Sequence, residues 1–304
     1  MRIPKRLLRM MAALLCLAAL LAPAALADDW YESKSGYYTV QDGDGQILFM
    51  RSVQIQVGDE YISGDNKLYR VTEVDDQARR AVAVYVEDIP AAQWQVTQTA
   101  QEGGSKPKVA LYCTHTDESY VPTDGSESAK EKGGIVDVAE ALTQELQANN
   151  VDAVLDDASH VPHDAGAYRR SRQTAVELLE EVQPELLLDI HRDGVPADQY
   201  EANFTGPAAS QVRVVIGKGN QNYEVNKELA ITLKQVADEK YPGLIKDIYL
   251  GKGSYNQDLM PNAILLEFGT HELEKEAAIE STKYMAEVIG TTLGVEPAAT
   301  PAPE

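Results

Sequence analysis

Between residues 108 and 293, short apolar runs alternate with longer segments whose apolar residues recur at helical spacing. The runs contain few polar residues, which is typical of strands that are buried on both faces of a sheet. This alternation predicts an α/β fold, a mostly parallel sheet with helices on both faces. The expected strands are VALY (109–112), VDAVL (151–155), ELLLDIH (185–191), QVRVVIG (211–217) and NAILLEFG (262–269).

The segments on either side of this α/β region have a different character. Residues 28–90 alternate apolar and polar residues between turn signals such as DGDG at 42–45, which predicts a small all-β domain. That segment contains no histidine or cysteine, so we expect a structural or binding module. Residues 91–107 are polar and lack periodicity, as linkers do, and the Pro- and Ala-rich residues 294–304 are typical of a disordered tail.

Residues 1–27 have the pattern of a secretory signal peptide. Four basic residues precede an apolar stretch that ends in Ala25-Leu26-Ala27, an A-x-A cleavage signal. The alternative is an uncleaved membrane anchor, but Pro23 interrupts the apolar stretch, which is shorter than the ~20 residues of a spanning helix. We therefore expect export across the cytoplasmic membrane. The mature protein would be secreted or cell-wall associated, or it would be membrane-anchored if the signal is not cleaved.

Charge and cysteine content narrow the classes of partner. Loss of the four basic residues of the signal takes the formal net charge from −21 to −25. Nucleic-acid binding depends on lysine and arginine at the phosphates, so we expect no nucleic-acid partner. Cys113 is the one cysteine outside the signal, so the mature chain can form no intrachain disulfide.

Metal-ligand and acid–base side chains follow three of the expected strands. His115 and Glu118 come after the first strand, His191 ends the third, and the last carries Glu267 near its end. Ligands in such folds bind beyond the carboxyl ends of the strands, so these side chains should meet at one edge of the sheet. Two histidines with a third ligand and an open position are typical of a catalytic zinc site. A remaining carboxylate can then act as general base on the bound water.

Other mechanisms find less support in the sequence. There is no G-x-S-x-G nucleophile elbow, and no glycine-rich phosphate loop follows the first strand. Cys113 lies inside a strand end, a position that favours a packed cysteine over a nucleophile. His160 and His163 lie in a loop, without the helical H-E-x-x-H spacing, and are either packing residues or a substrate contact or additional ligand.

Several long strings identify a family resemblance. They are THTDESYVP, HVPHDAGAYRRSRQTA, LLLDIHRDGVP and YPGLIKDIYLGKGSYNQDLMPNAILLEFGTH. Together they resemble the stage II sporulation protein P family, over roughly Val109 to Gly290. The resemblance implies an amidase-like α/β fold and a zinc-dependent peptidoglycan hydrolase, which cuts the amide between N-acetylmuramic acid and L-alanine of the stem peptide. Some family members also cleave the peptide cross-link.

Carried over residue by residue, the resemblance implies zinc ligands at His115, Glu118 and His191 and a catalytic carboxylate at Glu267. More distant amidases place the ligand glutamate nearer the first helix, so two further candidates for the third ligand stay open: Glu127 and Glu131. Many family members have histidine where this chain has Cys113. Candidates for holding the glycan or the stem peptide are Arg170, Arg172, Asn256 and Gln257.

The expected partners are peptidoglycan, through its glycan strand and stem peptide, and an activator protein of the cell-wall machinery. Two alternative functions stay open. One is a zinc peptidase that acts on the cross-link only, and the other is a cell-wall binding protein without turnover.

Overall fold

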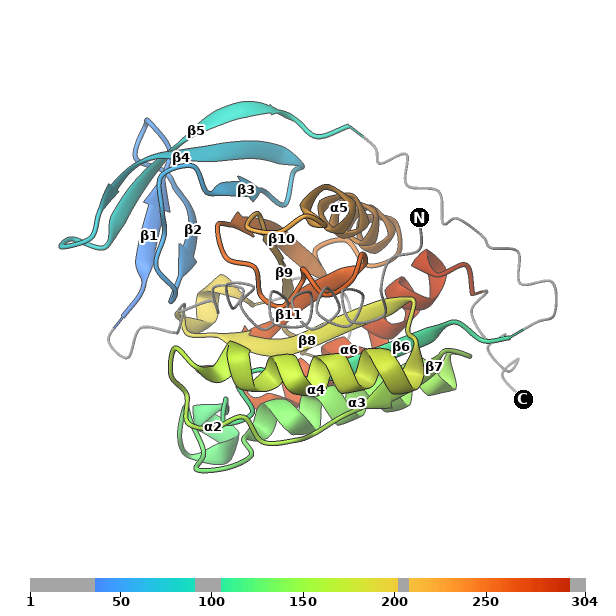
Figure 1. Ribbon diagram of the computed structural model, residues 1–304. Helices are drawn as coiled ribbons and strands as arrows, with labels where there is room; N and C mark the ends of the chain where they lie inside the picture. The colour runs from blue at the N-terminus through green and yellow to red at the C-terminus, as the bar shows by residue number, and fades with distance from the viewer. Residues whose placement is uncertain (1–35, 91–104, 202–207, 296–304) are drawn as a thin grey trace, which may run out of the picture.

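The structure is a computed structural model that describes residues 36–90, 105–201 and 208–295. These residues form an 11-stranded sheet with helices on both faces (Figure 1). The predicted signal peptide, most of the predicted linker and most of the predicted tail lie outside the described residues. Among the helices in the described ranges, none is long and apolar enough to cross a membrane.

The strands occur in the sheet in the order β2-β1-β5-β4-β3-β10-β9-β11-β8-β6-β7. Their bounds are β1 Tyr38–Gln41, β2 Ile47–Arg51, β3 Glu60–Ile62, β4 Lys67–Asp75, β5 Arg80–Asp88, β6 Lys108–Tyr112, β7 Asp152–Leu155, β8 Leu186–Asp193, β9 Val212–Gly217, β10 Ile245–Gly251 and β11 Ala263–Thr270. The helices are α2 Val121–Asp124, α3 Gly134–Ala148, α4 Ala167–Val182, the 3₁₀ turn η1 Ala197–Gln199, α5 Tyr223–Lys240 and α6 Lys275–Thr292.

The α/β part of the sheet is mostly parallel, as the sequence predicts. Among its neighbouring pairs, β10–β9, β11–β8, β8–β6 and β6–β7 are parallel, and β9–β11 is antiparallel. Strands β6, β8 and β11 therefore run in the same direction and end at the same edge. Strands β9 and β10 run the opposite way, a difference that apolar runs do not reveal because both directions bury the same residues.

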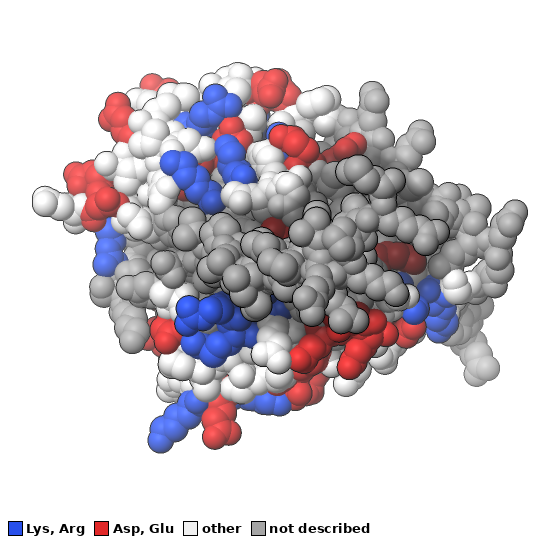
Figure 2. All heavy atoms as spheres, in the orientation of Figure 1, with Lys and Arg blue, Asp and Glu red and all other residues white. Residues whose placement is uncertain are grey.

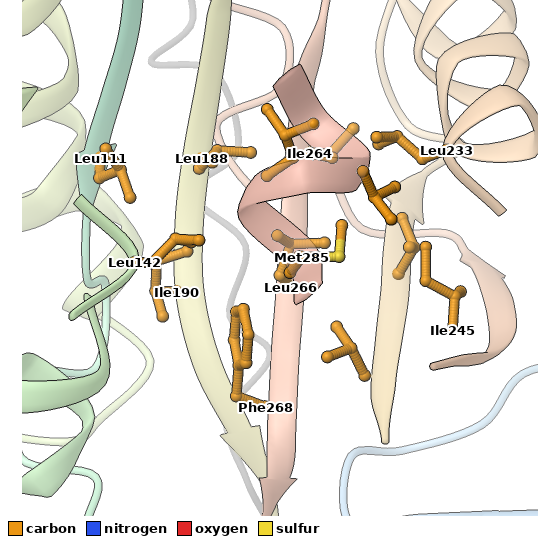
Figure 3. Packing of buried hydrophobic residues seen from close by; sticks show 14 of the residues in the cluster. Leu111, Leu142, Leu188, Ile190, Leu233, Ile245, Ile264, Leu266, Phe268 and Met285 are labelled. Carbon is orange, nitrogen blue, oxygen red and sulfur yellow. The ribbon is translucent and has the colours of Figure 1, made fainter. Parts of the chain in front are cut away.

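The two faces of this part of the sheet are covered by different helices. On one face, the strand residues Leu188 and Leu266 pack against Leu142 of α3, Leu233 of α5 and Met285 of α6 (Figure 3). On the other face, Ala110, Tyr112 and Leu187 pack against Ala175 and Leu178 of α4. The prediction of an α/β fold with helices on both faces is confirmed.

The N-terminal strands β1 to β5 continue the same sheet. Strand β3 pairs antiparallel with β10, opposite Ile248, Tyr249 and Leu250. Phe49 of β2 belongs to one buried cluster with Tyr168 of α4 and Leu265 of β11, and its ring lies 5.9 Å from that of Tyr249. Five strands form between residues 30 and 90, in the region where the sequence predicts β structure.

On the face shown in Figure 2, groups of acidic side chains lie beside lysine and arginine side chains. The excess of negative charge in the chain is therefore not gathered into one continuous area on the described part of this face.

Candidate metal centre and catalytic carboxylate

The ends of β6, β8 and β11 bring four sequence-predicted residues around one cavity. The parallel register places Tyr112 beside Asp189 and His191 beside Glu267. A cavity of about 30 Å³ is lined by His115, Glu118, His191 and Glu267, together with residues from other segments. All four side chains are buried.

Glu118 lies between the two predicted histidine ligands. A turn in which the Glu118 N–H donates to the His115 carbonyl brings this side chain back to the His115 ring nitrogen. Glu118 Oε1 is 3.0 Å from His115 Nδ1 and 3.2 Å from His191 Nδ1, and its Oε2 accepts a 3.0 Å hydrogen bond from the Arg192 N–H. Of the three candidate glutamates, the structure brings Glu118 to the histidines, whereas Glu127 and Glu131 are exposed.

His163 joins this cluster from the loop that precedes α4. Its ring stacks on that of His115 with centroids 3.9 Å apart, and ligand atoms of His115, Glu118 and His163 all lie within 4.8 Å of one another. His163 Nδ1 is 3.2 Å from Asp117 Oδ1, the carboxylate–histidine arrangement that orients metal-ligating imidazoles. The sequence leaves His163 open because a loop has no periodicity that would indicate where its side chains point.

The chemistry of this cluster fits a zinc ion. Imidazole nitrogens and a carboxylate oxygen are typical zinc ligands. His115 Nε2 is buried and has no hydrogen-bond partner in the part of the chain that the structure describes. Burial, followed by the proximity of His163, lowers the pKa of His115 to about 4, so this imidazole is neutral at pH 7 and able to bind a metal. His115 and Glu118 are common to the candidate ligand sets, and His191 and His163 are alternatives for the third position.

His191 is held between two carboxylates. Its Nε2 lies 3.0 Å from Asp189 Oδ1, outside hydrogen-bond geometry, and Asp189 accepts hydrogen bonds of 2.8 and 2.6 Å from Thr114. Burial lowers the pKa of His191, but Asp189 and Glu118 outweigh it and raise that pKa well above its ordinary value. For Glu118 the directions are reversed. Burial raises its pKa, but the attraction of His191 and His115 holds that pKa well below its ordinary value.

Glu267 has the pKa of an acid–base group. Burial, then the negative charge of Asp193, raises the pKa of Glu267 to about 7, against the opposing effect of two arginines. Its Oε1 accepts a 3.2 Å hydrogen bond from Arg51 Nη1, and its Oε2 lies 2.9 Å from the Tyr200 hydroxyl. A carboxyl group with a pKa near neutrality can accept and return a proton at physiological pH.

Comparison with known proteins identifies the family. The family described as stage II sporulation protein P (SpoIIP) matches residues 51–290, which is most of the chain. The chain belongs to this family. The stage II sporulation protein P of Bacillus subtilis (strain 168) is 31% identical over 188 residues, which cover 56% of this chain and 47% of that protein. The chain thus spans about half the length of this curated relative.

Two solved structures with a similar fold are amidases. The CwlD amidase from Clostridioides difficile, solved in complex with the GerS lipoprotein, is 13% identical with a TM-score of 0.41, covering 63% of this chain and all of that one. The catalytic domain of CwlV, an N-acetylmuramoyl-L-alanine amidase from Bacillus (Paenibacillus) polymyxa, is 14% identical with a TM-score of 0.43, covering 62% of this chain and 99% of that one. Sequence identities and TM-scores this low indicate a similar fold and do not indicate the activity of this chain.

The SpoIIP match begins at Arg51, and the position of this residue shows that one expectation about the N-terminal β segment is wrong. The sequence indicates no chemistry in the N-terminal β segment, yet the end of β2 places Arg51 and Ser52 in the lining of the same cavity. Ser52 Oγ donates a 3.0 Å hydrogen bond to Asp193 Oδ1. The sequence gives no local signal for these contacts because they join residues more than 140 positions apart.

The four predicted substrate-binding residues do not line the cavity. Arg172 makes a two-pronged ion pair with Asp258 at 2.7 and 2.6 Å, and Arg170 donates to the His160 carbonyl at 2.6 Å. Both arginines therefore have structural partners in the loops around α4.

Asn256 and Gln257 are buried, and their side chains form hydrogen bonds within the fold. Gln257 accepts from the Gly217 N–H at 2.8 Å and donates to the Val215 carbonyl at 2.9 Å, which ties the segment after β10 to β9. This segment starts at the opposite end of the sheet from Glu267 because β10 runs antiparallel to β11. The geometry gives the predicted substrate role of these residues no support, whereas their neighbour Tyr255 does line the cavity.

Two further side chains have packing roles. Cys113 is buried in the apolar core, and burial raises the pKa of its thiol well above the ordinary value, as expected of a packed cysteine. His160 is also buried, with Nδ1 2.7 Å from the Cys113 carbonyl and Nε2 2.8 Å from Thr174 Oγ1. Both of its nitrogens are thus engaged by the fold.

Proposed function

We propose that this protein is a zinc-dependent peptidoglycan hydrolase that cleaves the amide between N-acetylmuramic acid and L-alanine of the stem peptide. The observation that carries the proposal is the meeting, around one cavity, of the His115–Glu118 cluster and Glu267, whose pKa is about 7. Membership of the SpoIIP family supports it.

The roles follow from the chemistry of the residues. Zinc bound by His115, Glu118 and either His191 or His163 would lower the pKa of a water molecule to about 7 and polarise the scissile carbonyl. Ionised Glu267 takes the proton of the attacking water and returns it to the departing amine. Such proton transfer contributes ~10²–10⁴ in rate.

A second cavity offers room for a polymeric substrate. It has a volume of about 760 Å³, within the range of ~300–1,000 Å³ that is typical of ligand pockets. Its lining includes His163 and Asp117, and Arg192 lines this cavity as well as the smaller one. In the proposed function, the stem peptide or glycan lies here while the amide reaches Glu267.

We also propose that the protein is exported and acts at the cell wall. This rests on residues 1–27, which lie outside the described part of the chain, and on the proposed substrate. An activator protein stays a prediction from the sequence.

Digestion of purified sacculi tests the function. The full chain is incubated with sacculi and zinc, with and without a chelator, and the released products are identified by mass spectrometry. Free stem peptides and peptide-free glycan that disappear with chelator would support the amidase. Products with cut cross-links and intact muramoyl–alanine bonds would indicate the peptidase, and sacculus binding without release would indicate a binding protein.

A further inference from the structure

Arg51 has an unusual place for an arginine of an N-terminal strand. Its side chain is 2% exposed and lines the cavity that holds the metal cluster and Glu267. The guanidinium lies over the ring of Tyr249, 4.1 Å from its centroid, and the Tyr249 hydroxyl is fixed by a 2.6 Å hydrogen bond to Asp59. The orientation of the charged group is therefore set before any substrate binds.

The hydrogen-bonding capacity of Arg51 is largely unused. An arginine carries five N–H donors, and buried donors in folded proteins are nearly always satisfied. Among the residues that the structure describes, the one hydrogen bond from the Arg51 side chain runs from Nη1 to Glu267, and Nε is buried without an acceptor. Unused donors on a fixed, buried cation beside a cavity indicate that the missing acceptor comes from a ligand.

Arg213 provides an internal comparison. It is as buried as Arg51 and belongs to the same group of charges. Its Nε and Nη2 donate to Asp247 at 2.6 and 3.0 Å, and its Nη1 donates to the Met50 carbonyl and to Asp193. All three nitrogens of Arg213 are thus engaged by the fold, whereas Arg51 keeps donors for another group.

We propose that Arg51 is a further catalytic residue, whose guanidinium binds the oxygen of the scissile carbonyl. This inference rests on the proposed function. As the water oxygen bonds to the carbonyl carbon, the carbonyl oxygen gains the negative charge of the broken π bond. When the C–N bond breaks, the charge returns to the C=O bond and the amine leaves with the proton carried by Glu267. Arg51 keeps its protons throughout, because guanidinium is not deprotonated in proteins.

The magnitude of the effect follows from similar oxyanion donors. Removing one such donor costs ~10²–10³ in kcat. Arg51→Ala and Arg51→Gln should therefore bind zinc as the wild type does, by elemental analysis, and lose muropeptide release by about this factor. Arg51→Lys should be intermediate, since it keeps the charge without the forked donors. The matched control is Arg70→Gln, which removes an exposed arginine of the same β segment that pairs with Glu60.

Kinetics distinguish contact with substrate from support of Glu267. Rates are measured as a function of substrate concentration, so that kcat and KM are separated. The pH is chosen on the plateau of the pH–rate profile of each variant, where Glu267 is ionised. We expect the loss of activity in the Arg51 variants to appear in kcat. Millimolar guanidinium ion should partly restore the activity of Arg51→Ala and should not restore that of Glu267→Gln. A kcat within about threefold of wild type, well short of the 10²-fold expected, or a loss confined to KM, would overturn the proposal.

A binding measurement separates this inference from the proposed function. Inorganic phosphate serves as an oxyanion probe in titration calorimetry of the zinc-loaded full chain. Arg51→Ala should weaken phosphate binding by about tenfold or more, as expected for a lost charge-assisted pair, while Glu267→Gln should not weaken it. Arg51-dependent phosphate binding in a protein that releases no muropeptides would refute the proposed function and leave the anion site standing. Equal phosphate affinity in wild type and Arg51→Ala would refute the anion site itself.

Discussion

The hydroxyl of Tyr200 lies 2.9 Å from Oε2 of Glu267. The same hydroxyl is 3.0 Å from Oδ2 of Asp193, so one phenolic proton serves two buried carboxyl groups. A hydrogen bond donated to Glu267 favours its ionised form and opposes the burial that raises its pKa. Tyr200 thereby helps to set the pH at which Glu267 can act as a base.

Tyr200→Phe is therefore expected to alter the pH dependence of hydrolysis. Ionised Glu267 is the active form, so the rate should rise with pH through its pKa. Loss of the hydroxyl raises that pKa further, and the midpoint of the acidic limb should move to higher pH, measured as muropeptide release across pH 5–9. Tyr223→Phe, whose hydroxyl faces Glu60, is the control and should leave the midpoint in place. A midpoint that is unchanged or lower in Tyr200→Phe would contradict the role of this hydrogen bond.

Glu267→Gln should separate metal binding from catalysis. Glutamine retains the shape of the side chain but cannot take the proton of water, so release should fall by ~10²–10⁴ while the zinc content stays at the wild-type level. The matched control is Glu274→Gln, an exposed residue that accepts a hydrogen bond from Thr123. Full activity in Glu267→Gln would remove this residue from the mechanism.

Substitution of the histidines should identify the third ligand. His115→Ala and Glu118→Gln are expected to lose bound zinc, because both belong to every candidate ligand set in the structure. His163→Ala and His191→Ala are then compared by elemental analysis, and the variant with the larger loss marks the ligand. His271→Ala, outside the cluster, should retain the metal. Retention of zinc in His115→Ala would place the metal elsewhere.

Zinc should stabilise the folded protein. A ligand that binds only the native state adds about 2.7 kcal/mol at a concentration of 100 Kd. The Tm of the wild type should therefore be higher with zinc than with a chelator, by differential scanning calorimetry, and this difference should vanish in Glu118→Gln. An equal zinc-dependent shift in Glu118→Gln would show that the ion stabilises the fold from another position.

The part of the site that could be predicted from the sequence lies on adjacent parallel strands. His115, His191 and Glu267 follow or end β6, β8 and β11, and apolar runs locate such strand ends well. Since parallel strands end at one edge, knowing the ends was enough to bring these residues together.

The remaining parts depend on information that local patterns do not contain. His163 lies in a loop, so no periodicity fixes the direction of its ring. Asn256 and Gln257 follow Tyr255, which lines the cavity, but their own side chains bond to α4 and β9 instead, and no local pattern shows which way side chains in such a segment point. Arg51 and Glu267 are 216 residues apart, and their contact depends on how β2 lies over the sheet.

The pairing of β3 with β10 ties the N-terminal strands to the stability of the whole protein. Without them, Ile248, Tyr249 and Leu250 of β10 would lie on an open edge, with unpaired main-chain groups beside apolar side chains. Such edges promote association with other strands. The N-terminal segment therefore protects the larger part of the chain from aggregation. A fragment that begins at the linker is expected to aggregate even though it contains all the metal ligands.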